Sequence, residues 1–133
     1  MSTNLLIVDD DERICRMLGR YLKREGFKVR TAVDGIAMWQ LLDNAQSELI
    51  ILDLILPGVD GITLARELRL KYPNIGIIIL TAKNGIMDTI VGLEVGADDY
   101  ITKPVDNRVL LARINSVIRR VSNSTVDGID NGF

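Results

Sequence analysis

The sequence predicts an α/β fold, a doubly wound sheet of five parallel strands with helices on both faces. Apolar runs of strand length alternate five times with segments whose apolar residues recur at helical spacing. The strand-like runs are apolar throughout, as expected of parallel strands that are covered on both faces. Four of them lead into residues suited to phosphate or metal chemistry: Asp9-Asp10, Asp53, Thr81 and Lys103. In open α/β sheets these strand ends meet at one edge, where ligands bind.

The first strand–helix unit begins at Leu5–Val8, the first predicted strand. The helical stripe that follows contains Ile14, Met17, Leu18, Tyr21 and Leu22. Gly26 closes this helix, because glycine tolerates the left-handed conformation found beyond helix ends. The second strand is predicted at Val29–Val33, and Asp34 is the expected N-cap of the second helix. The stripe of that helix contains Met38, Leu41, Leu42 and Ala45.

The third strand–helix unit begins at Leu49–Leu52, the third predicted strand, and two more units follow it. Pro73-Asn74 ends the helix after it, Ile75–Leu80 predicts the fourth strand, and Tyr100–Ile101 weakly predicts the fifth. The stripe of the last helix contains Leu110, Ile114, Val117, Ile118 and Val121. Residues 1–120 therefore form one domain, and the polar residues 121–133 predict a linker or tail.

Composition indicates a soluble, cytoplasmic domain. The net charge of -2 over 133 residues gives no general electrostatic reason to bind nucleic acid or an anionic membrane. No apolar stretch approaches the ~20 residues of a membrane helix, and the first residues do not resemble a signal peptide. Cys15 is the only cysteine and lies on a predicted helix, which indicates a packing role. The chain has no histidine, so histidine-based catalysis and histidine metal ligation are excluded.

Three carboxylates are expected to meet at the carboxyl edge of the sheet. Asp9 and Asp10 follow the first strand and Asp53 the third, and these strands are neighbours in a doubly wound sheet. Two carboxylates ~4 Å apart repel by roughly 4 kcal/mol at an effective dielectric constant of about 20. A bound cation, or protonation of one group, must offset this repulsion. Oxygen ligands without histidine or cysteine favour a hard divalent ion, and Mg²⁺ is the expected cofactor.

The residues around this site predict phosphoryl transfer. Lys103 can supply a fixed positive charge to phosphate oxygens, Thr81 can donate its hydroxyl, and Asp53 is the candidate nucleophile. Each alone has an ordinary interpretation, because strand-end aspartates and threonines often cap helices and lysines are often surface charges. Their coincidence at four strand ends favours a functional site.

Four segments resemble the receiver domain of bacterial two-component response regulators, and the likeness extends over residues 4–120. They are Ile7–Asp10, Leu52–Gly61, Leu80–Ala82 and Gly96–Pro104. The last segment, with Leu111–Ile114 and Arg119-Arg120 after it, looks most like the OmpR/PhoB-type subfamily, whose members are transcription factors. The resemblance implies a flavodoxin-like sheet of strand order 2-1-3-4-5.

The resemblance also implies how the domain is phosphorylated. Asp53 would accept a phosphoryl group from a partner histidine kinase. Asp10 and Asp53 would ligate Mg²⁺ directly, Ile55 would add its backbone carbonyl, and Asp9 would act largely through water. Lys103 would contact the phosphate, and its peptide bond to Pro104 would be cis. Such a domain is a regulator and not an enzyme, since it catalyses only its own phosphorylation and dephosphorylation.

The output implied by the resemblance is a change of shape that promotes a homodimer. Thr81 would move toward the phosphate and Tyr100 would turn inward as the switch aromatic. Subfamily members pair through the fourth helix, fifth strand and fifth helix. The residues at these positions here are Ile90, Leu93, Asp98, Asp99, Leu111, Arg113 and Arg120. Thr89 and Val109 stand where one further ion pair is usual, so we expect a comparatively weak dimer.

Three functions remain to be compared. The first is the receiver of a transcription factor, with a DNA-binding domain following a linker that ends at Phe133. The second is a stand-alone receiver that binds a protein target. A gene sequence that continues past Phe133 would separate these two. The third is a hydrolase of the haloacid dehalogenase type, which needs a second aspartate two residues after the phosphorylated one. Ile55 stands at that position, which argues against the hydrolase.

Overall fold

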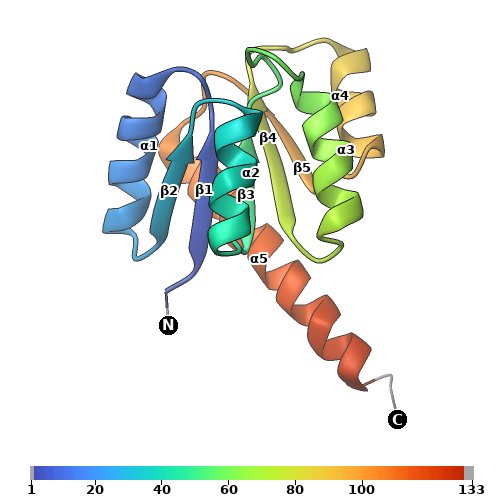
Figure 1. Cartoon of the computed structure of the whole chain (residues 1–133). Helices are drawn as coiled ribbons and strands as arrows, with labels where there is room; N and C mark the ends of the chain where they lie inside the picture. The colour runs from blue at the N-terminus through green and yellow to red at the C-terminus, as the bar shows by residue number, and fades with distance from the viewer. Residues whose placement is uncertain (1, 131–133) are drawn as a thin grey trace.

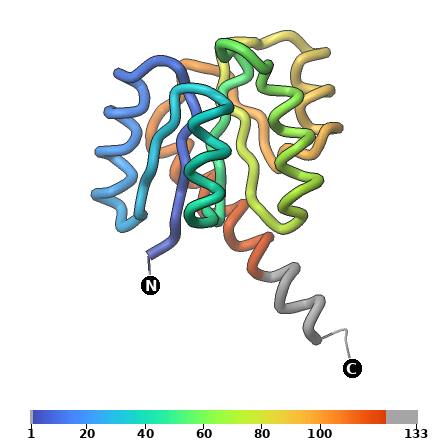
Figure 2. Tube along the Cα trace, in the orientation of Figure 1, coloured from blue at the N-terminus to red at the C-terminus, as the bar shows by residue number. Residues whose placement is uncertain are grey.

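The structure, a computed structural model, describes residues 2–130, with side chains described for residues 2–122 (Figure 2). Within this part of the chain, five strands alternate with five helices (Figure 1). The strands are β1 (Asn4–Val8), β2 (Lys28–Ala32), β3 (Leu49–Leu52), β4 (Gly76–Thr81) and β5 (Asp99–Thr102). The helices are α1 (Glu12–Arg24), α2 (Gly35–Asn44), α3 (Gly61–Lys71), α4 (Ile86–Glu94) and α5 (Asn107–Asp130).

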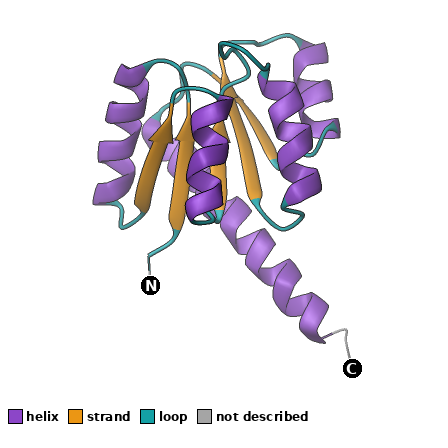
Figure 3. Cartoon of the chain, in the orientation of Figure 1, coloured by secondary structure: helices purple, strands orange, loops and turns teal. Residues whose placement is uncertain are grey.

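The sheet confirms the predicted fold class and strand order. Its order is β2-β1-β3-β4-β5, and each neighbouring pair is parallel. Helices α1 and α5 cover one face of the sheet, and α2, α3 and α4 cover the other (Figure 3). Because all strands run in the same direction, the residues that follow them leave the sheet at one edge. We call this the carboxyl edge.

Alternate residues of each strand pack on opposite faces of the sheet. In β1, Leu6 and Val8 belong to the core beneath α2 and α3, and Leu5 and Ile7 to the core beneath α1 and α5. All four are at most 1% exposed. Burial of such a side chain stabilises the fold by about 1.5–3 kcal/mol. The two cores therefore hold the central strands rigidly and fix where their ends lie.

Aspartate caps begin three of the helices at the carboxyl edge. Asp11 caps α1, Asp34 caps α2 as predicted, and Asp60 caps α3, each through a backbone N–H of the first turn. After α1, Gly26 adopts a φ of 99°, which confirms its predicted place beyond the helix end. These caps separate the aspartates with a structural role from those left for chemistry.

One residue of the predicted α1 stripe does not face the core. Leu18 and Leu22 are buried at 2% and 0% exposure, whereas Met17 is 55% exposed. The prediction that Met17 belongs to the buried stripe is therefore wrong. Its position is about 100° around the helix from Leu18, which turns its side chain toward the rim.

The fifth helix is longer than the sequence pattern predicts. Residues 121–130 continue α5 to Asp130, and their role as a linker to a further domain stays a prediction. These residues include no proline, and serine, asparagine and threonine each cost at most about 0.7 kcal/mol of helix propensity. Residues 131–133 of the predicted tail lie outside the described residues. Neither α5 nor any other described helix is long and apolar enough to span a membrane.

Candidate functional site

An acidic cluster lies at the carboxyl edge of the sheet. Asp9 and Asp10 follow β1, Asp53 follows β3, and one carboxylate oxygen from each lies within 4.8 Å of the others. The strand register causes this arrangement, because Val8 of β1 lies opposite Leu52 of β3. Asp9 and Asp53 are only 3% and 5% exposed. The structure thus brings together the three carboxylates that the sequence singles out.

Lys103 supplies the counter-charge for the two buried carboxylates. Its Nζ lies 2.7 Å from Asp9 Oδ2 and 2.9 Å from Asp53 Oδ2. Burial opposes the charge of this ammonium group, but the hydrogen bonds to both carboxylates outweigh it and raise the pKa of Lys103. Burial raises the pKa of Asp9 in spite of the lysine. The Lys103-Pro104 bond that follows is cis, as predicted.

Backbone N–H groups orient the two buried carboxylates. The Asp11 N–H donates to Asp9 Oδ1 at 2.9 Å, and the Ile55 N–H donates to Asp53 Oδ1 at 3.0 Å. In each carboxylate, the other oxygen then accepts from Lys103. Asp53 is therefore held with one oxygen on the backbone and one beside a cation. The structure places the N–H of Ile55 at the site, and the role of its carbonyl as a metal ligand stays a prediction.

The two predicted switch residues meet at Lys83, in the turn between β4 and α4. Thr81, the last residue of β4, is fully buried, and its hydroxyl oxygen accepts from the Lys83 N–H at 3.4 Å. The Tyr100 hydroxyl donates to the Lys83 carbonyl at 2.7 Å. Burial raises the pKa of Tyr100, and the charges of Asp88 and Asp53 add to this effect. One short turn therefore links the carboxyl edge to the aromatic side chain of β5.

The apolar residues predicted for a dimer contact are divided between surface and core. Ile90 and Leu93 on α4 are 41% and 44% exposed. Leu111 on α5 is partly buried and packs against the core beneath α1 and α5. Ile90 and Leu93 are thus available at the surface, together with Val91 at 37% exposure.

The charged residues predicted for the same contact already have partners within the chain. Arg113 Nη1 lies 2.9 Å from Asp99 Oδ2, and Arg120 donates to the Asp98 carbonyl at 3.4 Å. The Asp98 carboxylate accepts from Arg69 Nη2 and from the Ile77 N–H, both at 2.8 Å. An intersubunit role for these residues stays a prediction, and it would require a change of partner.

Arg69 is a structural residue that the sequence reasoning missed. Besides Asp98, its guanidinium donates to the carbonyls of Gly96, Pro73 and Ile75 at 2.7–3.0 Å. It therefore ties α3 to the turns before β4 and β5. No local sequence signal marks this arginine, because its partners lie up to 29 positions away.

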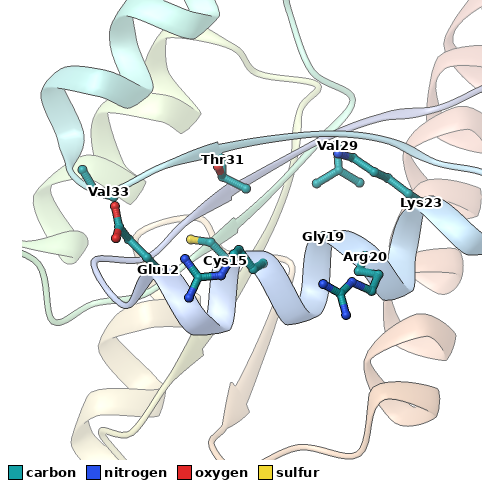
Figure 4. A pocket seen from close by; sticks show the side chains of 9 residues that line it. Glu12, Cys15, Gly19, Arg20, Lys23, Val29, Thr31 and Val33 are labelled. Atoms are coloured by element: carbon teal, nitrogen blue, oxygen red, sulfur yellow. The ribbon is translucent and has the colours of Figure 1, made fainter.

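A groove of about 520 Å³ lies between α1 and β2, and none of the three clustered carboxylates lines it (Figure 4). Gly19 and Val29 lie at one part of its wall, and Cys15 lies at another. The Cys15 thiol donates to the Asp9 carbonyl at 3.3 Å, and burial raises the pKa of Cys15 to about 11. Cys15 is buried in the core beneath α1 and α5, which confirms its packing role. None of the residues that line this groove belongs to the candidate site at the carboxyl edge.

Comparison with known proteins agrees with this geometry. Residues 5–115 match the response regulator receiver domain family. The chain is 43% identical to the transcriptional regulatory protein AfsQ1 of Streptomyces coelicolor over 129 residues, covering 97% of this chain and 57% of AfsQ1. It is 45% identical to protein PetR of Rhodobacter capsulatus over 125 residues, covering 94% of this chain and 52% of PetR. The chain thus spans about half the length of these relatives.

A solved structure supports the same conclusion. A CheY-like response regulator receiver domain from Methanospirillum hungatei superposes with a TM-score of 0.89 at 28% identity, covering 93% of this chain and 99% of that chain. The fold and the acidic cluster define a regulatory α/β domain with a charged carboxyl edge. The chain belongs to the receiver domain family of two-component response regulators.

Proposed function

We propose that Asp53 accepts a phosphoryl group from a partner histidine kinase, and that phosphorylation controls transcription through a homodimer. The observation that supports this best is the position of Lys103 Nζ, which lies within hydrogen-bond distance of both Asp9 and Asp53. The Ile55 N–H and Lys103 fix the Asp53 carboxylate, and Lys103 can pair with the negative charge that a phosphoryl group brings.

The side chains at the carboxyl edge divide the chemistry among them. An Asp53 oxygen would attack phosphorus, and the new P–O bond would form as the P–N bond to the donor imidazole breaks. Lys103 would neutralise charge on the phosphoryl oxygens, because its raised pKa keeps it protonated. The Thr81 hydroxyl would donate to one of those oxygens. The protein thus contributes mainly position and charge.

The acidic cluster fits a divalent cation. Asp9, Asp10 and Asp53 present only oxygen donors, the type that Mg²⁺ prefers. The ammonium group already lying between two of them shows that positive charge is accommodated there. We propose that these residues hold Mg²⁺, with Ile55 adding its carbonyl. When bound, the ion would neutralise the charge that develops on the transferred phosphoryl group.

Phosphorylation would reach the surface through Thr81, Lys83 and Tyr100. A new hydrogen bond from the Thr81 hydroxyl to phosphate would change the turn that holds the Tyr100 hydroxyl. To move a population from 1:99 to 99:1, phosphorylation must favour the active conformation by about 5.5 kcal/mol. Charge-assisted hydrogen bonds of about 1.5–3 kcal/mol each can supply this.

The proposed output is an OmpR/PhoB-type dimer that uses α4, β5 and α5. The exposed Ile90 and Leu93 support an apolar centre for it. A role in transcription is supported by the relative AfsQ1, named a transcriptional regulatory protein, of which this chain covers 57%. DNA would be bound by a domain outside this chain, since the net charge of -2 offers no basic surface overall.

Intact-mass spectrometry after incubation with acetyl phosphate and Mg²⁺ tests the phosphorylation. We expect one phosphoryl adduct on the wild type, none on Asp53→Ala, and none when EDTA removes the metal. Asp34→Ala is the matched control, because Asp34 is the N-cap of α2 and should leave the adduct intact. An adduct of equal yield on Asp53→Ala would contradict the assignment of Asp53.

A further inference from the structure

Gly92 lies inside α4 at a point where a larger residue would force neighbouring side chains to shift. A Cβ atom built on Gly92 would lie 2.8 Å from Tyr100 Cδ2, 3.0 Å from Tyr100 Cε2 and 2.9 Å from Ile79 Cδ1. Real Cβ atoms essentially never approach other heavy atoms to less than 3.0 Å. The ring of Tyr100 therefore packs directly against the backbone of α4.

Helix propensity does not explain this glycine. Glycine is the least favourable residue in a helix interior apart from proline, so α4 is weakened by its presence. Gly19 in α1 offers a comparison, because a Cβ there would meet only Val29 Cγ1, at an ordinary 3.8 Å. Both glycines are buried within helices, but only Gly92 is required by close approach of a neighbouring side chain.

Two contacts hold the Tyr100 side chain, one at the turn before α4 and one in α4 itself. Its hydroxyl donates to the Lys83 carbonyl in the turn before α4, and its ring edge lies on Gly92 in the helix itself. The ring thus spans from the turn that contacts Thr81 to the helix that exposes Ile90 and Leu93.

We infer that Gly92 is a positioning residue of the phosphorylation switch: its missing side chain forms the seat for the Tyr100 ring and so couples the ring to α4. Movement of the ring out of this seat frees α4 to shift, and movement into it fixes α4 against β5. This inference rests on the proposed role of Tyr100 as the switch aromatic, whereas the packing of the ring on Gly92 is present in the unphosphorylated structure.

The first test uses unphosphorylated protein. In NMR spectra of tyrosine-labelled wild type, with Tyr100 assigned through Tyr100→Phe, we expect nuclear Overhauser effects from the Tyr100 ring to the Gly92 Hα and Ile79 methyl protons. Gly92→Ala should abolish the first contact and shift the Tyr100 ring signals toward those of an exposed tyrosine. Gly19→Ala should leave them unchanged. Absence of the Gly92 contact in the wild type would overturn the inference.

The second test separates the seat from a general packing defect. Gly92→Ala should lower the urea midpoint clearly more in the wild type than in a Tyr100→Ala background, where the ring is gone and only the end of the Ile79 side chain must shift. Gly19→Ala should have the same effect in both backgrounds. If Gly92→Ala lowers the midpoint equally in both, the clash is with Ile79 or the helix and not with the ring, and the inference is wrong.

The third test addresses the switch. Gly92→Ala should form the Asp53 adduct at the wild-type rate but weaken phosphorylation-promoted dimerisation about tenfold, within the usual range of allosteric coupling. Dimerisation equal to that of the phosphorylated wild type would overturn the positioning role. Failure of the wild type to form the adduct would instead contradict the proposed function, while the two tests above would still decide whether Gly92 seats the ring.

Discussion

Two charged regions of this domain are built in opposite ways. At the carboxyl edge, Asp9 and Asp53 are buried, and one ammonium group serves both of them. On the face formed by α4, β5 and α5, Arg113 pairs with Asp99 near solvent, with the arginine side chain 52% exposed. The first arrangement is costly when any member is lost, whereas the second can exchange partners at little cost. The contrast agrees with the proposed function, in which the site stays fixed and the surface changes its partners.

The largest expected effect comes from removing the shared cation. Lys103→Met keeps an unbranched apolar stem, one atom shorter, but leaves two buried carboxylates without their shared cation, and we expect the free energy of unfolding to fall by about 3 kcal/mol at pH 8 without divalent ions. Urea unfolding measures this. Because burial already raises the pKa of Asp9, the folded variant takes up protons as the pH falls, and the loss should shrink toward pH 5.

Magnesium and a surface lysine provide the controls for that variant. Millimolar Mg²⁺ should restore most of the stability of Lys103→Met, since the ion replaces the missing charge. Lys71→Met should change the unfolding free energy by less than about 1 kcal/mol, because Lys71 is 55% exposed and 3.8 Å from Asp43. A loss at Lys103 no larger than at Lys71 would show that the buried position of Lys103 adds nothing to the effect of an exposed charge.

An intermediate effect is expected at Arg69, because its side chain is 24% exposed, between the buried Lys103 site and the exposed Arg113 pair. Arg69→Ala removes hydrogen bonds to three carbonyls and to Asp98, and we expect a loss of about 2 kcal/mol in urea unfolding. Arg66→Ala, on the same helix but exposed, should cost less than about 0.5 kcal/mol. Equal losses would mean that the Arg69 contacts contribute nothing beyond helix formation.

The smallest effect on the monomer is expected at the exposed pair. Arg113→Ala should lower the unfolding free energy by under about 1 kcal/mol, because solvent screens its interaction with Asp99. The same variant should weaken the phosphorylated dimer measurably if the pair exchanges between subunits. A dimer of unchanged affinity would restrict the contact to the apolar residues of α4.

The carboxyl edge was predictable from the sequence because strand ends determine it. Four of the five apolar runs lead into the functional residues, and parallel pairing brings Asp9, Asp53 and Lys103 together at one edge. For the face formed by α4, β5 and α5, the sequence predicted which residues lie there but not which partners they bind. That Asp98 binds Arg69 and that Arg113 binds Asp99 depends on how α3 and α5 pack, which no local pattern encodes.

Two further features of the helices have local physical causes. The polar residues after residue 120 resemble a linker, but without proline they remain compatible with helix, and α5 continues to Asp130. Gly92 is an isolated glycine in a helical pattern, a signal that could have indicated close approach of another group. The sequence does not show that this group is the Tyr100 ring.

The central claim is that phosphorylation at the carboxyl edge changes the face formed by α4, β5 and α5 and so promotes dimerisation. Sedimentation equilibrium of the wild type and Asp53→Ala, each with Mg²⁺ and with or without acetyl phosphate, tests this most directly. We predict that acetyl phosphate increases the dimer fraction of the wild type and leaves Asp53→Ala unchanged. A fully phosphorylated wild type that sediments as the same species as the unphosphorylated protein at every concentration tested would contradict the account.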